Sequence, residues 1–244
     1  MFKYLKNAFS KFKDTLICMT IVAFTILISL HPIDSPLIAS VSAVEHYPTV
    51  IIDAGHGGED CGTVGISGIY EKDLNFAISE KLCEYLINSG FKAVMTRTED
   101  ALLYTDEQNV KGQRKIYDLK NRVSIANSYD DSIFISIHMN WFADPDCKGA
   151  EIYCSSNEAS LFLGKEIREA IINSVQPDNK RTLKNGKGIY LLENSINPAI
   201  LIECGFLSNE KECEKLSQKE YQKELCFSIL CGIIEYSKKN YFRS

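Results

Sequence analysis

The sequence lacks the cysteine spacing of a zinc knuckle, because none of its nine cysteines forms a C-x2-C pair. Histidine is scarce, and beyond the first 43 residues only His46, His56 and His138 occur. No internal repeat, domain linker or low-complexity tract is present. These absences exclude repeat proteins and disordered chains, and 244 residues suffice for one sizeable domain.

A basic stripe is also missing from most of the chain. Residues 1–43 hold four lysines and two aspartates, so the net charge of −5 for the whole chain becomes −7 for residues 44–244. Nucleic acid is therefore excluded as a partner. An anionic polymer would have to be held by specific contacts, since the overall charge does not attract it.

The first 43 residues predict a signal peptide or an uncleaved membrane anchor. Lys3, Lys6, Lys11 and Lys13 precede an uncharged, mostly apolar run over residues 15–30 (TLICMTIVAFTILISL). A basic segment before an apolar one is typical of export signals. The apolar run is short for a membrane span, which speaks against an anchor. The VSA tripeptide at 41–43 could be a cleavage site, but it lies far beyond the end of the run, which speaks against a signal peptide. Both interpretations therefore stay open. Either one predicts an exported protein.

Residues 46–240 are predicted to form a single catalytic domain in which strands alternate with helices. Expected strands cover residues 49–53, 92–96, 133–138, 150–154, 189–192 and 199–203, and expected helices cover residues 72–88, 118–128, 158–175 and 219–238. Asp118 is the expected cap of the second helix. Most of the eight cysteines beyond the leader are interpreted as small buried hydrophobes. The pattern predicts an α/β fold with a twisted, mostly parallel sheet of about six strands and helices on both faces.

Two histidines lie at the carboxyl end of a predicted strand or just after it. His56 comes three residues after the strand at 49–53, and His138 ends the strand at 133–138. Ligands of open α/β sheets bind outside the carboxyl ends of the strands. Either histidine alone is explained as a polar loop residue, but both together indicate a shared site.

Two carboxylates complete the pattern. Glu71 follows a glycine-rich loop that could bring it back to His56, although it also fits as a first-turn carboxylate favoured by the helix dipole. Glu203 ends an apolar strand, where an unpaired carboxylate is costly. His56, Glu71 and His138 would leave a fourth zinc position open for water, as catalytic zinc sites do, and Glu203 is the spare carboxylate for proton transfer. The residues alone predict a zinc hydrolase and leave the substrate open.

Six ordered blocks add a resemblance to a known family. They are HYPTVIIDAGHGGEDCG, IYEKDLNFAISEKL, LKNRVSIAN, IFISIHMNW, KGAEIY and PAILIECGFLSNEKE. In order and spacing they resemble the zinc-dependent N-acetylmuramoyl-L-alanine amidases (amidase type 3) over about residues 48–236. The resemblance implies hydrolysis of the amide bond between N-acetylmuramic acid and L-alanine in peptidoglycan.

Carried over to this sequence, the resemblance implies one Zn²⁺ held by His56, Glu71 and His138, with Glu203 as the catalytic carboxylate. Arg122 and Asn140 fall in motif positions implied to shape the site, and we expect them to bind substrate, although a surface arginine and a polar loop residue are the simpler explanations. Glu151 could face the groove or cap the core, and the second is favoured.

Only residues 139–149 separate the second zinc histidine from the next predicted strand, which is too short for the inhibitory helix that some family members insert there. A short body behind a hydrophobic N-terminus resembles the spore-cortex (germination-specific) amidases of the family. The expected partners are the peptidoglycan polymer, the membrane if the N-terminus is uncleaved, and a regulator that the sequence does not identify. The expected location is the cell wall, the outer face of the cytoplasmic membrane or the spore cortex.

Two rival functions remain from sequence alone. One is another zinc hydrolase of wall peptides or sugars, such as a carboxypeptidase or a deacetylase. The other is a non-catalytic wall-binding or regulatory protein. Product analysis separates the first, and zinc content with a turnover assay separates the second.

Overall fold

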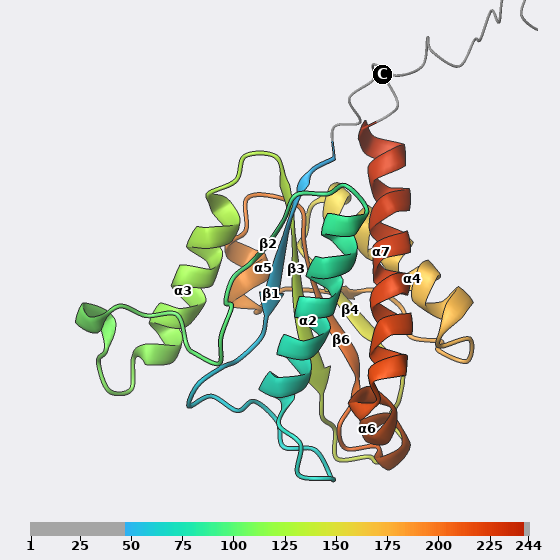
Figure 1. Ribbon diagram of the computed structural model, residues 1–244, viewed down its shortest axis with the longest axis horizontal. Helices are drawn as coiled ribbons and strands as arrows, with labels where there is room; N and C mark the ends of the chain where they lie inside the picture. Colours follow the sequence, from blue (N-terminus) through green and yellow to red (C-terminus); the bar gives the residue numbers. More distant parts are fainter. Residues whose placement is uncertain (1–46, 242–244) are drawn as a thin grey trace, which may run out of the picture. The chain divides into compact units, whose positions relative to one another are not determined.

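A six-stranded sheet forms the centre of the computed structural model, which describes residues 47–241 (Figure 1). Its strands are β1 (Thr49–Ala54), β2 (Ala93–Met95), β3 (Ser132–Asn140), β4 (Glu151–Cys154), β5 (Lys184–Asn185) and β6 (Ala199–Phe206). Their spatial order is β2-β1-β3-β6-β4-β5. The β4–β6 pair is antiparallel and the other four pairs are parallel. The first residue of β4 therefore lies at the same edge as the carboxyl ends of β1, β3 and β6.

Helices cover both faces of this sheet (Figure 1). One layer holds α2 (Glu71–Asn88), α4 (Glu158–Ser174), α6 (Glu210–Ser217) and α7 (Lys219–Tyr241). The other holds α3 (Arg114–Asn127) and the short α5 (Tyr190–Asn194), and a 3-10 turn, η1 (Asp106–Gln108), precedes α3. The predicted fold class, a mostly parallel six-stranded sheet between two helical layers, is confirmed.

Strand alternation divides the core into two parts. In β3, Ile133, Ile135 and Ile137 pack toward the α2/α7 layer, whereas Phe134 packs toward α3 and α5. On α2 the fully buried apolar side chains recur every four residues, at Ile78, Leu82 and Leu86. Each such side chain contributes about 1.5–3 kcal/mol through removal of apolar surface from water. The spacing of apolar residues in the sequence thus determines which face of each strand and helix is buried.

The expected strand at 189–192 is wrong, because these residues begin helix α5. The Ile189 carbonyl accepts hydrogen bonds from the amides of Leu192 and Glu193, both at 3.0 Å, which closes a helical turn. Leu191 and Leu192 are both buried although they are adjacent, which strand alternation would not allow on one face. A short apolar run does not distinguish a strand from a turn of helix.

Asp118 does not cap a helix, which corrects a second expectation. Helix α3 begins at Arg114, and Asp118 lies inside it, 3% exposed. Its carboxylate accepts hydrogen bonds from the Leu103 amide at 2.7 Å and from Arg122 Nε at 2.8 Å. Helix α6 and strand β5 were not predicted, because neither has a strong apolar pattern.

Eight cysteines lie in the described part of the chain, and all are free thiols there. Four are buried, Cys154, Cys204, Cys213 and Cys226, and the other four are partly exposed. Within residues 47–241 no helix has the length and apolar character needed to cross a membrane. The predicted signal peptide or anchor, residues 1–43, lies outside the described residues.

Candidate active site

A row of polar side chains crosses the sheet at the edge where β1, β3 and β6 end. His138 on β3 is the register partner of Glu203 on β6, and Glu203 is the register partner of Glu151 on β4. Directly paired residues point to the same face of a sheet. By alternation this is the face on which α3 and α5 pack, and apolar side chains such as Phe134 occupy it closer to the amino ends of the strands. The change from apolar to polar along one face places a site at this edge.

Glu71, the first residue of α2, joins the two histidines. Its Oε1 atom lies 2.9 Å from His138 Nδ1 and 3.2 Å from His56 Nε2. One potential ligand atom from each of the three residues falls within 4.8 Å of the others. The structure therefore brings together the three residues that the sequence predicted to meet.

The spacing of these atoms fits a divalent cation. Zinc ligands of nitrogen and oxygen lie 2.0–2.2 Å from the metal, so tetrahedral ligands stand about 3.4 Å apart. The two distances to Glu71 are slightly shorter than this, and a small outward movement of the side chains would fit them to an ion. Two imidazoles and one carboxylate are also a donor set that catalytic zinc sites use.

Backbone contacts hold Glu71 in place. Its Oε2 accepts a hydrogen bond from the Thr63 amide at 2.8 Å, and its Oε1 accepts one from the Met139 amide at 3.2 Å. Asn75 Nδ2, one turn further along α2, lies 3.4 Å from Oε1. The carboxylate is only about 4% exposed, so these donors replace the water it loses on burial.

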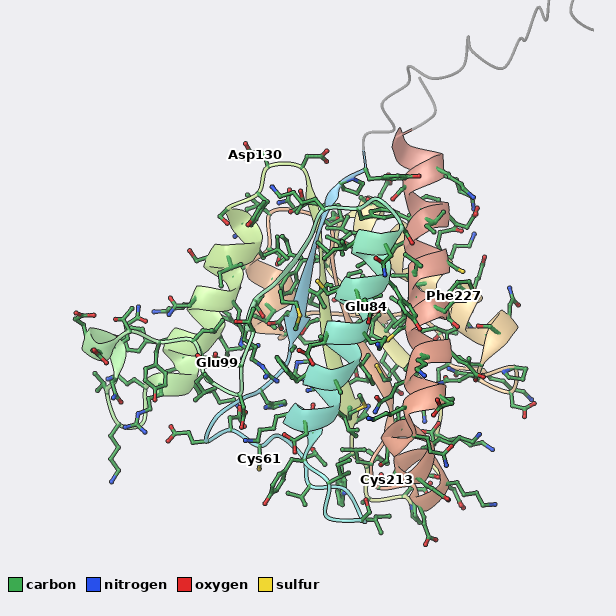
Figure 2. The ribbon with its side chains drawn as sticks, viewed as in Figure 1. Cys61, Glu84, Glu99, Asp130, Cys213 and Phe227 are labelled. Carbon is green, nitrogen blue, oxygen red and sulfur yellow. The ribbon has the colours of Figure 1, made fainter. Side chains whose placement is uncertain are left out.

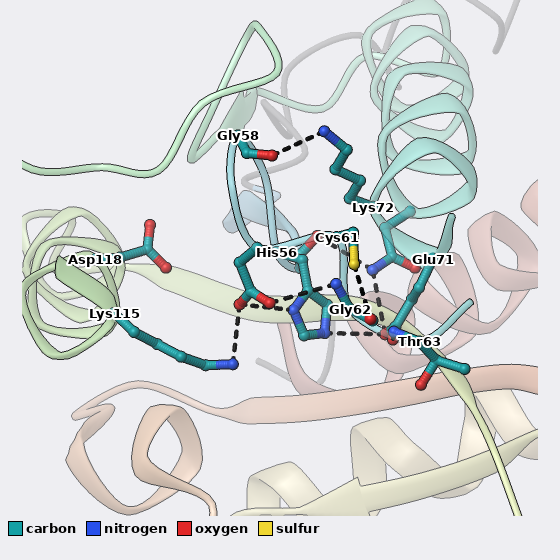
Figure 3. Close-up of polar contacts among 12 residues, drawn as sticks. His56, Gly58, Cys61, Gly62, Thr63, Glu71, Lys72, Lys115 and Asp118 are labelled. Carbon is teal, nitrogen blue, oxygen red and sulfur yellow. Dashed lines mark hydrogen bonds and ion pairs between the residues drawn. The ribbon is translucent and has the colours of Figure 1, made fainter. Parts of the chain in front are cut away.

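Asp60 orients His56, and the sequence analysis did not single it out. Its Oδ2 lies 2.9 Å from His56 Nδ1 and 2.9 Å from Lys115 Nζ, so Nε2 of His56 is left facing Glu71 (Figure 3). A carboxylate on the outer nitrogen of a metal-binding histidine fixes its tautomer and ring orientation. The signal that could have revealed Asp60 is its position four residues after His56.

Close packing explains why the loop between β1 and α2 is rich in glycine. A Cβ on Gly55 would lie 2.2 Å from the His138 ring, and a Cβ on Gly62 would lie 2.6 Å from Glu71 Oε2. His56 itself has φ of +61°, a left-handed conformation that is uncommon for a residue with a side chain. Such strain is typical of functional sites, where surrounding contacts maintain it.

The charges in this cluster support one another. Burial lowers the pKa of His56, but the neighbouring carboxylates of Asp60 and Glu71 outweigh it and raise that pKa to about 9. Burial acts to raise the pKa of Glu71, and the two imidazoles hold it well below its ordinary value. Glu71 is therefore ionised at neutral pH, as a metal ligand must be.

Glu203 has the opposite environment. Burial is the main cause that raises its pKa to about 7, with the negative charges of Glu71 and Glu151 adding to it. Its Oε2 atom is buried and has no hydrogen-bond partner among the described residues. A buried carboxyl with a free oxygen and a pKa near 7 is suited to accept and donate protons at neutral pH.

Arg122 does not reach the surface of the site, which corrects the expectation that it binds substrate. Its side chain is 1% exposed and donates hydrogen bonds to Asp53, Asp118 and the carbonyl oxygens of Ala54 and His56, all at 2.7–2.8 Å. The guanidinium thereby fixes the backbone at Ala54 and His56 from within the core.

Asn140, at the end of β3, and Glu151, at the start of β4, contact each other although β6, the strand of Glu203, lies between their strands. Asn140 Nδ2 donates to Glu151 Oε2 at 3.1 Å, and Asn140 is partly exposed. Glu151 is 2% exposed and pairs with Arg181 and, at 2.8 Å, with Lys184. Glu151 is thus a buried carboxylate held by two partly exposed cations, which the sequence analysis had not identified.

A donor set of this kind, beside a spare carboxyl at the carboxyl edge of an α/β sheet, is typical of hydrolases that activate water with a divalent cation. Comparison with known proteins assigns the chain to one family within this class. The family model described as N-acetylmuramoyl-L-alanine amidase (Amidase_3) matches residues 50–235. The chain belongs to this family and is an N-acetylmuramoyl-L-alanine amidase by activity.

Individual relatives agree with the family. The chain is 33% identical over 192 residues to the germination-specific N-acetylmuramoyl-L-alanine amidase of Bacillus subtilis, which covers 77% of this chain and 78% of the relative. It is similar to the CwlD amidase from Clostridioides difficile, solved in complex with the GerS lipoprotein, with 39% identity, a TM-score of 0.76 and coverage of 79% of this chain and 100% of the other. The amidase AmiC2 of Nostoc punctiforme is 30% identical with a TM-score of 0.66, covering 78% of this chain and 96% of that one.

Proposed function

We propose that this amidase is zinc-dependent and that His56, Glu71 and His138 hold the ion. The observation that carries the proposal is the convergence of these three side chains, from a loop, a helix start and a strand end, within 4.8 Å of one another. Asp60 gives further support to the proposal, because its carboxylate contacts the outer nitrogen of His56, as a partner of a metal-binding histidine ordinarily does.

A bound zinc ion would supply two effects here, a lowered pKa for a coordinated water and polarisation of the scissile carbonyl. Glu203 accepts the proton of the attacking water and delivers it to the departing amine of L-alanine. Its position directly across from His138, its unpartnered oxygen and its pKa near 7 support both steps. The carbonyl attacked is that of the lactyl group of N-acetylmuramic acid.

Asn140 remains the proposed substrate contact of this site. It ends β3 two residues beyond His138, and its partly exposed amide lies beside Glu151. An amide at this position could bind a peptide or N-acetyl group of the substrate through either its donor or its acceptor atom. Arg122 is proposed as a supporting residue, because its hydrogen bond to the His56 carbonyl holds the ligand loop.

The test combines metal analysis with product analysis. Purified enzyme is expected to contain one zinc per chain and to release peptides with a free L-alanine amine from peptidoglycan, leaving the sugar strand intact. A chelator should abolish turnover, and added zinc should restore it. Release of acetate would indicate a deacetylase instead, and full activity without metal would refute the zinc proposal.

Single substitutions separate the two roles. Glu203→Gln is expected to abolish turnover and keep the zinc, because Glu203 is not among the proposed ligands. His56→Ala and His138→Ala are expected to lose the zinc as well as the activity. Full turnover by Glu203→Gln would refute its assignment as the proton carrier.

For the biological role, we propose maturation of the spore cortex, with residues 1–43 directing the enzyme out of the cytoplasm as a signal peptide or an anchor. The germination-specific relative from Bacillus subtilis supports this role. The complex of the CwlD relative with a lipoprotein supports a protein partner at the membrane surface. Spores that lack this chain should then contain cortex glycan whose muramic acid residues all keep their peptides, and a normal cortex in such spores would contradict the role.

A further inference from the structure

Four apolar side chains next to the active site remain exposed. Val64 and Ile66 belong to the loop between β1 and α2, and Trp141 and Phe142 follow β3 directly. We call these four residues the apolar rim. Each is about half exposed or more, between 49% and 58%. Exposed apolar groups that gather in one place commonly mark a binding surface.

Both segments of the apolar rim are tied to the same pair of residues after β6. The Ile66 amide donates to the Leu207 carbonyl at 3.2 Å, and the Phe142 amide donates to Ser208 Oγ at 3.1 Å. Cys213 on α6, labelled in Figure 2 at the end of the molecule where these loops gather, lies 3.3 Å from Ser67 Oγ. The apolar rim is therefore held by hydrogen bonds to a common support.

Trp141 is the member of the rim best placed for substrate. It lies three residues after His138, so the two Cα atoms are at most about 10 Å apart. Its amide donates to Asn140 Oδ1 at 2.8 Å, and the Asn140 carbonyl accepts from Leu207 at 2.8 Å, which fixes the backbone of this segment. Within the described part of the chain the hydrogen bond of Trp141 is that of its backbone amide, so the half-exposed indole N–H is available to donate to a ligand.

The surroundings of the apolar rim and the β4 side of the active site differ in charge, because the charged groups that line a hollow with Ile66 are acidic, Glu210 and Glu214 of α6. Residues 64–70 and 139–143, which carry the apolar rim, contain no charged side chain. On the β4 side, the partly exposed cations Arg181 and Lys184 pair with the buried carboxylate of Glu151. The substrate is divided in the same way, because its glycan is uncharged once the lactyl groups are in amide linkage, whereas its stem peptide carries free carboxylates.

From this match we propose that Trp141, supported by the apolar rim, binds the N-acetylated glycan strand of the substrate by stacking on a sugar ring. The inference rests on the proposed function, since it takes peptidoglycan as the substrate. An indole offers a broad apolar face to the C–H face of a pyranose ring, and its N–H can donate to an N-acetyl carbonyl. The stem peptide would then extend toward Arg181 and Lys184.

The test uses the fact that Trp141 is the single tryptophan of the sequence. Its fluorescence is measured in Glu203→Gln protein, which avoids turnover, while peptide-free glycan strands of N-acetylglucosamine and N-acetylmuramic acid, with their lactyl carboxylates capped as simple amides, are added. The emission is expected to shift or change in intensity to saturation with glycan. The free stem tetrapeptide is expected to leave it unchanged.

Kinetics of variants give an independent readout. Trp141→Ala is expected to raise KM for peptidoglycan about tenfold with kcat nearly unchanged, a loss equivalent to about 1.4 kcal/mol. Trp141→Phe keeps an aromatic face and should recover most of that loss. Phe227→Ala is the matched control, because Phe227 is a 59% exposed aromatic residue on α7, away from the site (Figure 2), and should keep the wild-type KM.

An emission change with the stem peptide and none with glycan would overturn the inference. An unchanged KM in Trp141→Ala would also overturn it and assign the apolar rim to another occupant, such as a partner protein. Failure of the proposed function is distinguishable, because glycan that changes the emission while wild-type enzyme releases no L-alanine amine would support the binding inference and refute the reaction.

Discussion

Asp60 lies 2.9 Å from Nδ1 of His56, so one short loop supplies both a proposed metal ligand and the carboxylate that orients it. Lys115 of α3, labelled in Figure 3, contacts the same carboxylate at 2.9 Å and links the loop to the neighbouring helix. The orientation of His56 thus depends on Asp60, which is not one of the proposed ligands, and a substitution of Asp60 can test this dependence.

Asp60→Asn is expected to lower zinc affinity by about 10- to 100-fold, the usual cost of losing such a partner of a ligand histidine. The amide keeps the size of the side chain and removes its charge. Competition with a chromogenic chelator measures the affinity. Lys115→Gln is the control, because Lys115 is 62% exposed and its loss should change the affinity far less. Equal affinity in Asp60→Asn and wild type would show that Asp60 does not orient His56.

Gly62→Ala is expected to impair zinc binding and activity strongly. The added Cβ would lie 2.6 Å from Glu71 Oε2 and 2.8 Å from His56 Cδ2, and the backbone has φ of +64°. Gly68→Ala separates the steric effect from backbone strain, since Gly68 has φ of +79° with nothing within 4 Å of its added Cβ. The control should lose about 1–2 kcal/mol of stability from the left-handed backbone and retain zinc. Similar zinc loss in both variants would contradict the steric explanation.

Arg122→Met is expected to destabilise the fold by about 3–5 kcal/mol, because it leaves two carboxylates, Asp53 and Asp118, buried without their cation. Urea unfolding of metal-free protein measures this loss. Arg122→Lys restores the charge but not the forked geometry, so it should recover only part of the stability. If Arg122 instead contacted substrate, Arg122→Met would raise KM and leave unfolding unchanged.

Glu203 predicts a pH dependence of stability in the metal-free protein. Burial raises its pKa to about 7 from an ordinary value of 4.5, so the folded state holds a proton that the unfolded state has released between these pH values. The free energy of unfolding therefore falls as pH rises from about 4.5 to 7, by on the order of 3 kcal/mol from this group. Glu203→Gln should remove this part of the fall, as urea unfolding at several pH values would show. Parallel profiles for the two proteins would contradict the raised pKa.

The elements with a clear apolar period were predictable from sequence, and so was the meeting of the two histidines. Ile78, Leu82 and Leu86 define the buried face of α2 by spacing alone. His56 follows β1 and His138 lies near the end of β3, and these two parallel strands end at one edge. The run at 189–192 was misassigned because four apolar residues fit a strand as well as a turn of helix.

The supporting residues were harder to predict than the proposed ligands. Arg122 was placed correctly on a helix, but the sequence does not show that this helix turns it toward Asp53 in the core. Asp60 stands in a glycine-rich loop, where a carboxylate has many explanations. Contacts between segments that are distant in the sequence decide such roles, and the spacing of residues along one segment does not predict these contacts.

The sharing of Glu71 between two imidazoles has a consequence for how the enzyme would bind the proposed metal. With a pKa of about 9, His56 carries a proton at neutral pH in the metal-free cluster, and a ligand nitrogen must give up its proton before it can coordinate. Loading the site would therefore acidify an unbuffered solution, and acid conditions would favour the proton over the ion. Metal-free enzyme is therefore expected to bind the proposed zinc less completely in acid than at neutral pH.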